Sequence, residues 1–133
     1  MKQVLSIEQM KHLQELGLDT SDASMCIEWR ESDESKKVVT SLDADTYYDY
    51  YHETYTLQDI LDKLPESIQI YDLYIFKQAG LWYFEYIDVI EDEVFHSEIL
   101  LRIMDAAYYM LCWCIEKGYI KVDKEVKDGR KEN

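Results

Sequence analysis

Proline and glycine are scarce in this chain of 133 residues, which holds one proline and four glycines. Irregular loops are rich in both, so their scarcity favours regular helices and strands joined by short turns. No run reaches the roughly 18 apolar residues that a membrane-spanning helix needs. The longest candidate, 99–115, is interrupted by Arg102 and Asp105, and the sequence therefore predicts no membrane span.

Basic residues are also few, with 14 against 28 acidic ones, and the formal net charge is −14. Such a field repels phosphate backbones and anionic lipid headgroups, which disfavours direct binding to nucleic acid or to a membrane. The same field attracts basic proteins, although acidic charge can also serve solubility alone. The composition therefore predicts a basic protein as the partner, if the surface charge has a use.

Three cysteines make an odd number, and no apolar signal segment follows Met1. Both features are typical of a protein of the reducing cytoplasm. Cys112 and Cys114 are two residues apart on an expected helix and point in different directions, so they cannot share a metal ion. We interpret them as small core residues.

Hydrophobic residues make up 47% of the chain, which is enough for a buried core at this length. We expect one acidic domain over 1–120, followed by a charged, frayed tail over 121–133. No internal repeat or linker divides the chain.

Two capping patterns predict the first two helices. Ser6 and Gln9 form the pattern S-x-x-Q before a helix over 7–16, which Gly17 ends. Thr56 and Asp59 form a similar pattern before a short helix over 57–63.

The remaining segments predict strands and one long helix. Runs rich in β-branched and aromatic residues favour strands, and the last two of these read as a hairpin closed by the loop 77–80. The expected strands are 24–30, 38–41, 68–76 and 81–90. Ser97 is expected to open a long apolar helix that runs to Lys117 and lies across the sheet. The predicted fold is α+β: an antiparallel sheet of three to four strands, with a long C-terminal helix and one or two shorter helices packed on one face.

Patterns for catalysis, cofactors and metals are missing from the sequence. His12, His52 and His96 have no metal-ligand spacing, and neither a G-x-S-x-G motif nor a glycine-rich phosphate loop occurs. A carboxylate–imidazole site at 91–96 is conceivable, but a solvated loop is the preferred interpretation of that segment. We therefore predict no catalytic, cofactor-binding or metal-binding residue and do not expect an enzyme.

The segment 43–55, DADTYYDYYHETY, combines five tyrosines with acidic residues and has no basic residue. Tyrosine is favoured at protein interfaces, so this segment is the candidate partner-binding surface. The alternative is that some of these rings cover the core. The candidate residues are Asp43, Asp45, Tyr47, Tyr48, Asp49, Tyr50, Tyr51 and Glu53. Its periodicity is ambiguous, and we favour an irregular or helical turn over a strand.

Three stretches carry a resemblance to known proteins: LSIEQMKHLQELGLDTS at 5–21, YTLQDILDKLP at 55–65 and DAAYYMLCWCIEKGYI at 105–120. They resemble recurring sequence motifs in a group of small proteins of unknown function from phages and mobile elements of gut bacteria. The shared motifs are helix caps and core helices, so no activity or site residue can be transferred. The resemblance implies a bacterial cytoplasm and an accessory role.

Three functions remain open on the sequence. The first is a non-catalytic accessory protein of a mobile element, which binds a basic protein through an acidic, tyrosine-rich surface. The second is a small-molecule-binding module or minor enzyme with a pocket between the sheet and the long helix. The third is a self-associating protein whose exposed aromatic residues, Trp82, Phe84 and Tyr86, form the contact.

Overall fold

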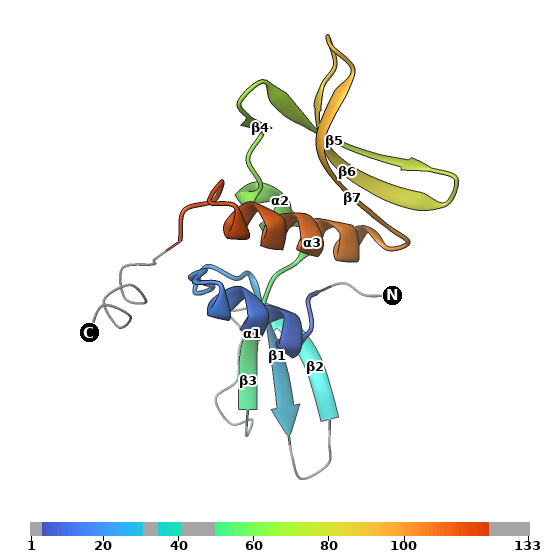
Figure 1. Cartoon of the computed structure of the whole chain (residues 1–133). Helices are drawn as coiled ribbons and strands as arrows, with labels where there is room; N and C mark the ends of the chain where they lie inside the picture. Colours follow the sequence, from blue (N-terminus) through green and yellow to red (C-terminus); the bar gives the residue numbers. More distant parts are fainter. Residues whose placement is uncertain (1–3, 31–34, 41–49, 123–133) are drawn as a thin grey trace, which may run out of the picture. The chain divides into compact units, whose positions relative to one another are not determined.

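The computed structural model describes residues 4–30, 35–40 and 50–122. The chain divides into two compact units (Figure 1). The first is Met1–Asp59 with Val122–Asn133, and the second is Ile60–Lys121. The boundary falls inside one short helix, α2 (Leu57–Lys63). Each unit has its own antiparallel sheet, so each is described by itself.

The first unit pairs one helix with a three-stranded sheet. It contains α1 (Ile7–Glu15), β1 (Met25–Arg30), β2 (Ser35–Thr40) and β3 (Tyr50–Thr54). The strand order is β2-β1-β3, and β1 pairs antiparallel with both neighbours. α1 contacts β3, and the buried apolar residues of this unit include Leu5, Met10, Leu13 and Tyr55.

Both predicted helix caps are confirmed. Ser6 Oγ accepts a hydrogen bond from the Gln9 backbone N–H, and the Gln9 side chain accepts one from the Ser6 backbone N–H. Gly17 ends α1 with φ at 102°, a conformation that glycine adopts without strain. At α2 the same exchange links Thr56 and Asp59. Local sequence therefore specifies these helix starts before any long-range packing.

The second unit is a four-stranded sheet with one long helix. It contains β4 (Ser67–Ile68), β5 (Tyr71–Gln78), β6 (Leu81–Asp88), β7 (Glu93–Leu100) and α3 (Ile103–Glu116). The strands follow one another in the order β4-β5-β6-β7, and all neighbours are antiparallel. The predicted hairpin is confirmed as β5 and β6. Its turn is shorter than the predicted loop 77–80, because Lys77 and Gln78 pair with β6, and it consists of Ala79 and Gly80, which both have positive φ.

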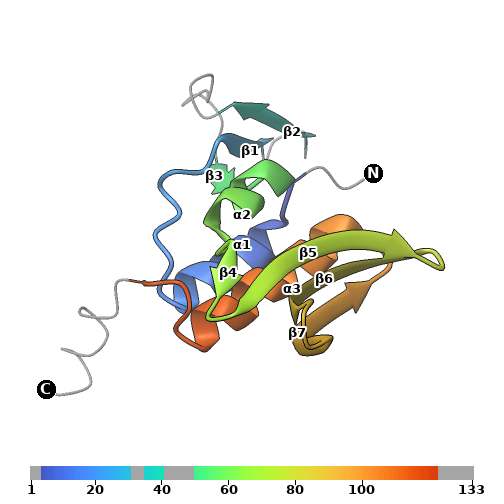
Figure 2. The ribbon, with the colours of Figure 1, turned by 90° about the horizontal axis from the view of Figure 1, so that it is seen from above.

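α3 packs against β6 and β7, as the views in Figures 1 and 2 show. Phe84 and Tyr86 of β6 are fully buried, and nine of the 14 residues of α3 are buried. The expectation of a mostly buried C-terminal helix on a sheet is confirmed. The suggestion that Phe84 and Tyr86 are exposed for self-association is wrong, because both side chains have no accessible surface.

The predicted start of the long helix at Ser97 is wrong. Residues 93–100 form strand β7, which pairs with β6 from Trp82↔Leu100 to Asp88↔Glu93, and α3 begins only at Ile103. Ser97 makes a cross-strand hydrogen bond in place of a helix cap. The actual N-cap, Arg102, makes no side-chain cap bond, so the true helix start has no local signal.

The preference for an irregular or helical turn in 43–55 is also wrong where the structure describes it. Residues 50–54 form β3, which pairs with β1 from Met25↔Thr54 to Trp29↔Tyr50. The strand propensity of tyrosine and threonine prevails once a pairing partner is present. Residues 43–49 lie outside the described residues.

The α+β class with antiparallel strands and a C-terminal helix packed on a sheet is confirmed. The strands divide into two sheets, whereas the sequence predicts a single sheet. The expected single domain over 1–120 stays a prediction.

Replacing Ser6 with alanine is expected to lower the free energy of unfolding by about 1 kcal/mol, because the cap of α1 is lost. Urea unfolding followed by circular dichroism measures the change. Ser6→Asp keeps an acceptor at the cap and serves as the control, with stability close to the original. Equal losses in the two variants would contradict the assigned cap.

Candidate functional site

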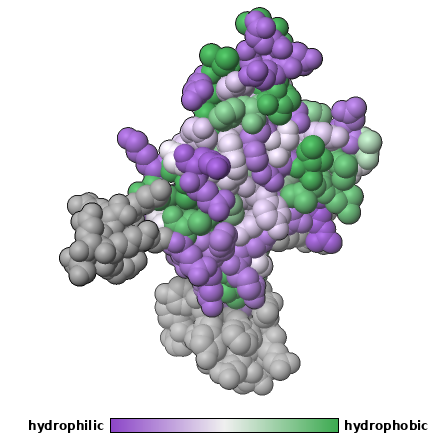
Figure 3. Space-filling view, in the orientation of Figure 1, coloured by the Kyte–Doolittle hydropathy of each residue, from purple (hydrophilic) through white to green (hydrophobic). Residues whose placement is uncertain are grey.

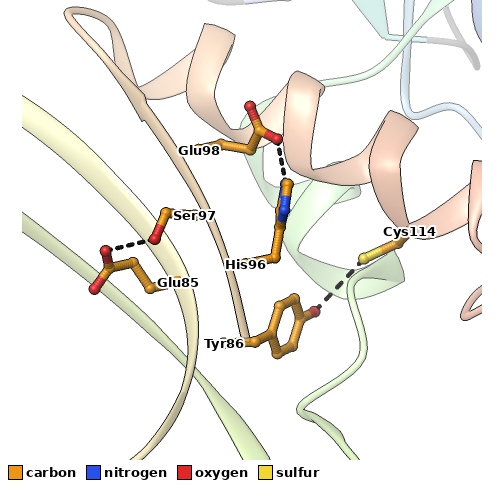
Figure 4. A network of polar contacts seen from close by, with 6 residues as sticks. All are labelled: Glu85, Tyr86, His96, Ser97, Glu98 and Cys114. Atoms are coloured by element: carbon orange, nitrogen blue, oxygen red, sulfur yellow. Dashed lines mark hydrogen bonds and ion pairs between the residues drawn. The ribbon is translucent and has the colours of Figure 1, made fainter. Parts of the chain in front are cut away.

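The most concentrated polar group in the second unit surrounds His96 on β7 (Figure 4). His96 Nε2 and Glu98 Oε2 are 2.5 Å apart, and the imidazole lies flat on the indole of Trp113. The ring centroids are 3.9 Å apart and the planes differ by 2°. Two residues apart on a strand, His96 and Glu98 share one face of the sheet, the face that α3 covers.

A β-bulge shapes the neighbourhood of His96. Tyr86 pairs with His96 and Ile87 pairs with Val94, so Phe95 has no partner on β6. Regular pairing would place Phe95 on the opposite face. With the bulge, Phe95 contacts Trp113 edge-on at 5.8 Å and stacks on Tyr71 at 4.6 Å. Aromatic rings therefore fill the contact between β7 and the end of α3.

Ser97, the residue between His96 and Glu98, points to the other face of the sheet (Figure 4). Its Oγ donates a hydrogen bond to Glu85 Oε2 at 2.7 Å, and Glu85 is its cross-strand partner on β6. The sheet separates the serine hydroxyl from the imidazole. This serine and this histidine therefore cannot act together as nucleophile and base.

Cys114 lies beneath the same strands, fully buried, with its Sγ 3.9 Å from the hydroxyl of Tyr86. That hydroxyl also donates to the Pro65 carbonyl at 2.8 Å. Burial raises the pKa of the Cys112 and Cys114 thiols to about 11, and the pKa of Tyr86 is raised for the same reason. A reactive cysteine needs a lowered pKa and access, so both thiols are core groups.

The face of β5, β6 and β7 opposite α3 carries mostly apolar side chains, and we name it the open face. Its exposed members include Tyr74 at 41%, Val94 at 48% and Ile99 at 43% exposure. The register places the others on the same face, half-buried for the most part. The open face consists of Asp72, Tyr74, Phe76, Gln78, Leu81, Tyr83, Glu85, Ile87, Val94, Ser97 and Ile99.

Charge on the open face is of one sign. Its acidic residues are Asp72 and Glu85, and it contains no Lys, Arg or His. Lys77 is the single Lys or Arg of β5, β6 and β7, and it belongs to the other face, where its Nζ lies 5.7 Å from the Trp82 ring. The open face therefore combines exposed apolar area with negative charge.

The turn between β6 and β7 also combines exposed apolar side chains with acidic residues. Val89 and Ile90 are exposed, Ile90 at 88%, and three carboxylates follow them at positions 91–93. In Figure 3 apolar and hydrophilic side chains meet at the upper end of the view, where Figure 1 shows this turn. The solvated-loop interpretation of 91–96 holds for Glu91 and Asp92, whereas Glu93 and His96 belong to β7.

Most of the predicted partner-binding residues cannot be assigned to this surface. Asp43, Asp45, Tyr47, Tyr48 and Asp49 lie outside the described residues. Tyr50 and Tyr51 belong to β3, where only their backbone is described. The Glu53 side chain accepts a hydrogen bond from Thr20 Oγ1 at 2.9 Å. The use of 43–55 as a binding surface stays a prediction.

Sequence reasoning missed both His96–Glu98 and Ser97–Glu85. The alternation of His96, Ser97 and Glu98 was the available signal, but it carries meaning only if the segment is a strand. A helix beginning at Ser97, as the sequence predicts, has no strand pairing with β6 and leaves both contacts out.

Among the described residues, no group of three or more His, Cys, Asp or Glu side chains is placed to hold a metal ion. The described helices include none that is long and apolar enough to cross a membrane. The chain matches no protein-family model, no curated protein and no solved structure. The residues and their geometry therefore carry the functional argument.

The free energy of unfolding is expected to fall as the pH rises from about 9 toward 11. The folded state holds Cys112 and Cys114 at a pKa of about 11, against an ordinary value of 9.0. Their contribution is therefore complete below pH 9 and is lost through this window, at most about 1.4 kcal/mol per pH unit for each thiol. Urea unfolding at a series of pH values measures the slope.

The double variant Cys112→Ala, Cys114→Ala is the control for this slope. It should show a smaller fall, and the part that remains belongs to buried tyrosines such as Tyr86 and Tyr108, whose pKa values are also raised. An unchanged slope in the double variant would remove the thiols from the explanation.

His96→Ala is expected to lower the free energy of unfolding by about 1–3 kcal/mol, since it loses both the stack on Trp113 and the bond to Glu98. Thermal and urea unfolding measure the loss. His96→Phe keeps a ring over Trp113 and should recover part of it. Full stability in His96→Ala would show that the stack contributes nothing.

Proposed function

We propose that the protein is a non-catalytic accessory protein that binds a basic protein partner. The observation that carries this proposal is the open face, a sheet surface with exposed apolar side chains whose acidic residues, Asp72 and Glu85, have no basic residue beside them on that face. Exposed apolar area of this kind marks interaction sites on folded proteins, and the negative charge selects cationic partners.

The side chains that could take part in catalysis are occupied by structural contacts, which supports a non-catalytic role. His96 is engaged with Glu98 and Trp113, Ser97 lies on the other face, and Cys112 and Cys114 are buried thiols. Each of these contacts stabilises strand pairing or the packing of α3. The open face keeps exposed apolar side chains that these contacts do not use.

The net charge of −14 supports the same partner chemistry over a longer range. A field of this strength speeds the approach of a basic protein and slows that of nucleic acid. Residues 43–55 of the first unit are a separate acidic, tyrosine-rich segment for which the sequence predicts the same partner chemistry. The resemblance to proteins of phages and mobile elements supports an accessory role in such an element.

A bacterial cytoplasm is the compartment we propose for this role. Cys26, Cys112 and Cys114 are all described and form no disulfide. This state fits a reducing compartment.

Selection from a randomised displayed-peptide library tests the proposal without knowledge of the natural partner. Immobilised protein should enrich peptides of net positive charge that bind the open face, with affinity falling as salt rises. In Ile99→Asp a carboxylate would be buried beneath the bound peptide, so affinity should fall more than tenfold. Isothermal titration calorimetry of the enriched peptides measures the change.

Tyr109→Asp provides the matched control, because Tyr109 is 50% exposed and belongs to α3, which packs on the opposite face of the sheet. It introduces the same charge and should leave the affinity within a few-fold of the original. Enrichment of neutral or acidic peptides, or equal binding by Ile99→Asp, would contradict the proposal.

A further inference from the structure

We infer that Glu85 selects the partner: the segment that covers the open face presents an arginine whose guanidinium binds the Glu85 carboxylate. This inference rests on the proposed function and names the group that the partner must supply. It follows from the position of Glu85 within the open face, from its hydrogen bonding and from the rings beside it.

Glu85 lies near the middle of the open face and is half-buried there. Across the strands its neighbours are Tyr74 on β5 and Ser97 on β7. Along β6 the next residues on the same face are Tyr83 and Ile87. A partner that buries this surface therefore removes water from the carboxylate.

The carboxylate is only partly satisfied by the protein. Oε2 accepts the bond from Ser97 Oγ, and the described residues supply no hydrogen bond to Oε1. Burying a carboxylate whose charge is uncompensated is strongly unfavourable. A partner with an apolar or anionic group at this position would bear that cost, and a cation at this position removes it.

Arginine fits the surroundings better than lysine. A guanidinium donates in its plane to a carboxylate while its face stacks on an aromatic ring, whereas an ammonium group is a strongly hydrated point charge. Tyr74 stands opposite Glu85 and Tyr83 stands beside it, and Tyr83 is itself held by stacking on Phe76 with centroids 4.7 Å apart. Rings on two sides of the carboxylate therefore favour the planar cation.

A second copy of this chain is a poor occupant of the open face because its own open face supplies no cation for Glu85. Its open face brings only the carboxylates of Asp72 and Glu85 and no Lys or Arg. Face-to-face pairing would bury like charges against one another, which is destabilising.

The test uses the peptides enriched on the full-length protein and a double-mutant cycle. Glu85→Gln removes the charge but keeps an acceptor for Ser97, and it should weaken binding about 10-fold to 100-fold. Replacing one peptide arginine with the neutral isostere citrulline should cause a similar loss. Combining the two changes should cost little more than either alone, because both remove one shared bond.

Glu116→Gln is the matched control, since Glu116 is exposed on α3 and its loss removes the same charge. It should change affinity by less than about threefold. Exchange of the same arginine for lysine should weaken binding to the original protein more than binding to Glu85→Gln. Near-ultraviolet circular dichroism confirms that each variant is folded. Glu85→Asp keeps the carboxylate on a shorter side chain, and its affinity should lie between those of the original protein and Glu85→Gln.

Two results would overturn the inference: unchanged affinity in Glu85→Gln, or losses from the two changes that simply add. In that case, peptides that are basic and sensitive to Ile99→Asp would leave the proposed function standing. Failure to enrich any such peptide would instead remove the proposed function. A peptide-free dimer that Ile99→Asp dissociates in sedimentation would show that a second copy is the occupant, against both.

Discussion

The packing of α3 against β6 and β7 is the contact on which the second unit depends. It buries Phe84 and Tyr86 and draws His96 onto Trp113, so one face of the sheet becomes core. Because successive strand residues alternate between faces, the same contact leaves Tyr83, Glu85 and Ile87 on the outside. The exposed surface is thus a consequence of how the core is built.

Local sequence predicted the parts of the fold that local interactions specify. The caps at Ser6 and Thr56, the end of α1 at Gly17 and the hairpin of β5 and β6 all follow from short-range rules. The start of α3 and the strand at 50–54 did not, because each depends on pairing with a distant segment. Local propensity cannot show that a partner strand is present.

The candidate site was less predictable than the fold. A surplus of carboxylates indicated the chemistry of the partner, yet it gave no reason to single out Glu85 among 28 acidic residues. That choice needs the register that sets Glu85 between Tyr74 and Ser97, and the register exists only in the folded sheet. The tyrosine-rich segment that drew attention in the sequence is largely outside the described residues.

The bulge at Phe95 shifts the alternation of β7 by one residue, so that Val94 lies on the same face as Ser97 and Ile99. Deleting Phe95 would restore an unbroken ladder in which Val94 still pairs with Ile87 and His96 with Tyr86, and it would remove the aromatic ring that contacts Trp113. The layer between β7 and Trp113 would then lose its edge-on ring and contain a gap. Insertions in related sequences should therefore be found in the turn after Asp88, where an extra residue changes neither the pairing of β6 with β7 nor their packing on α3.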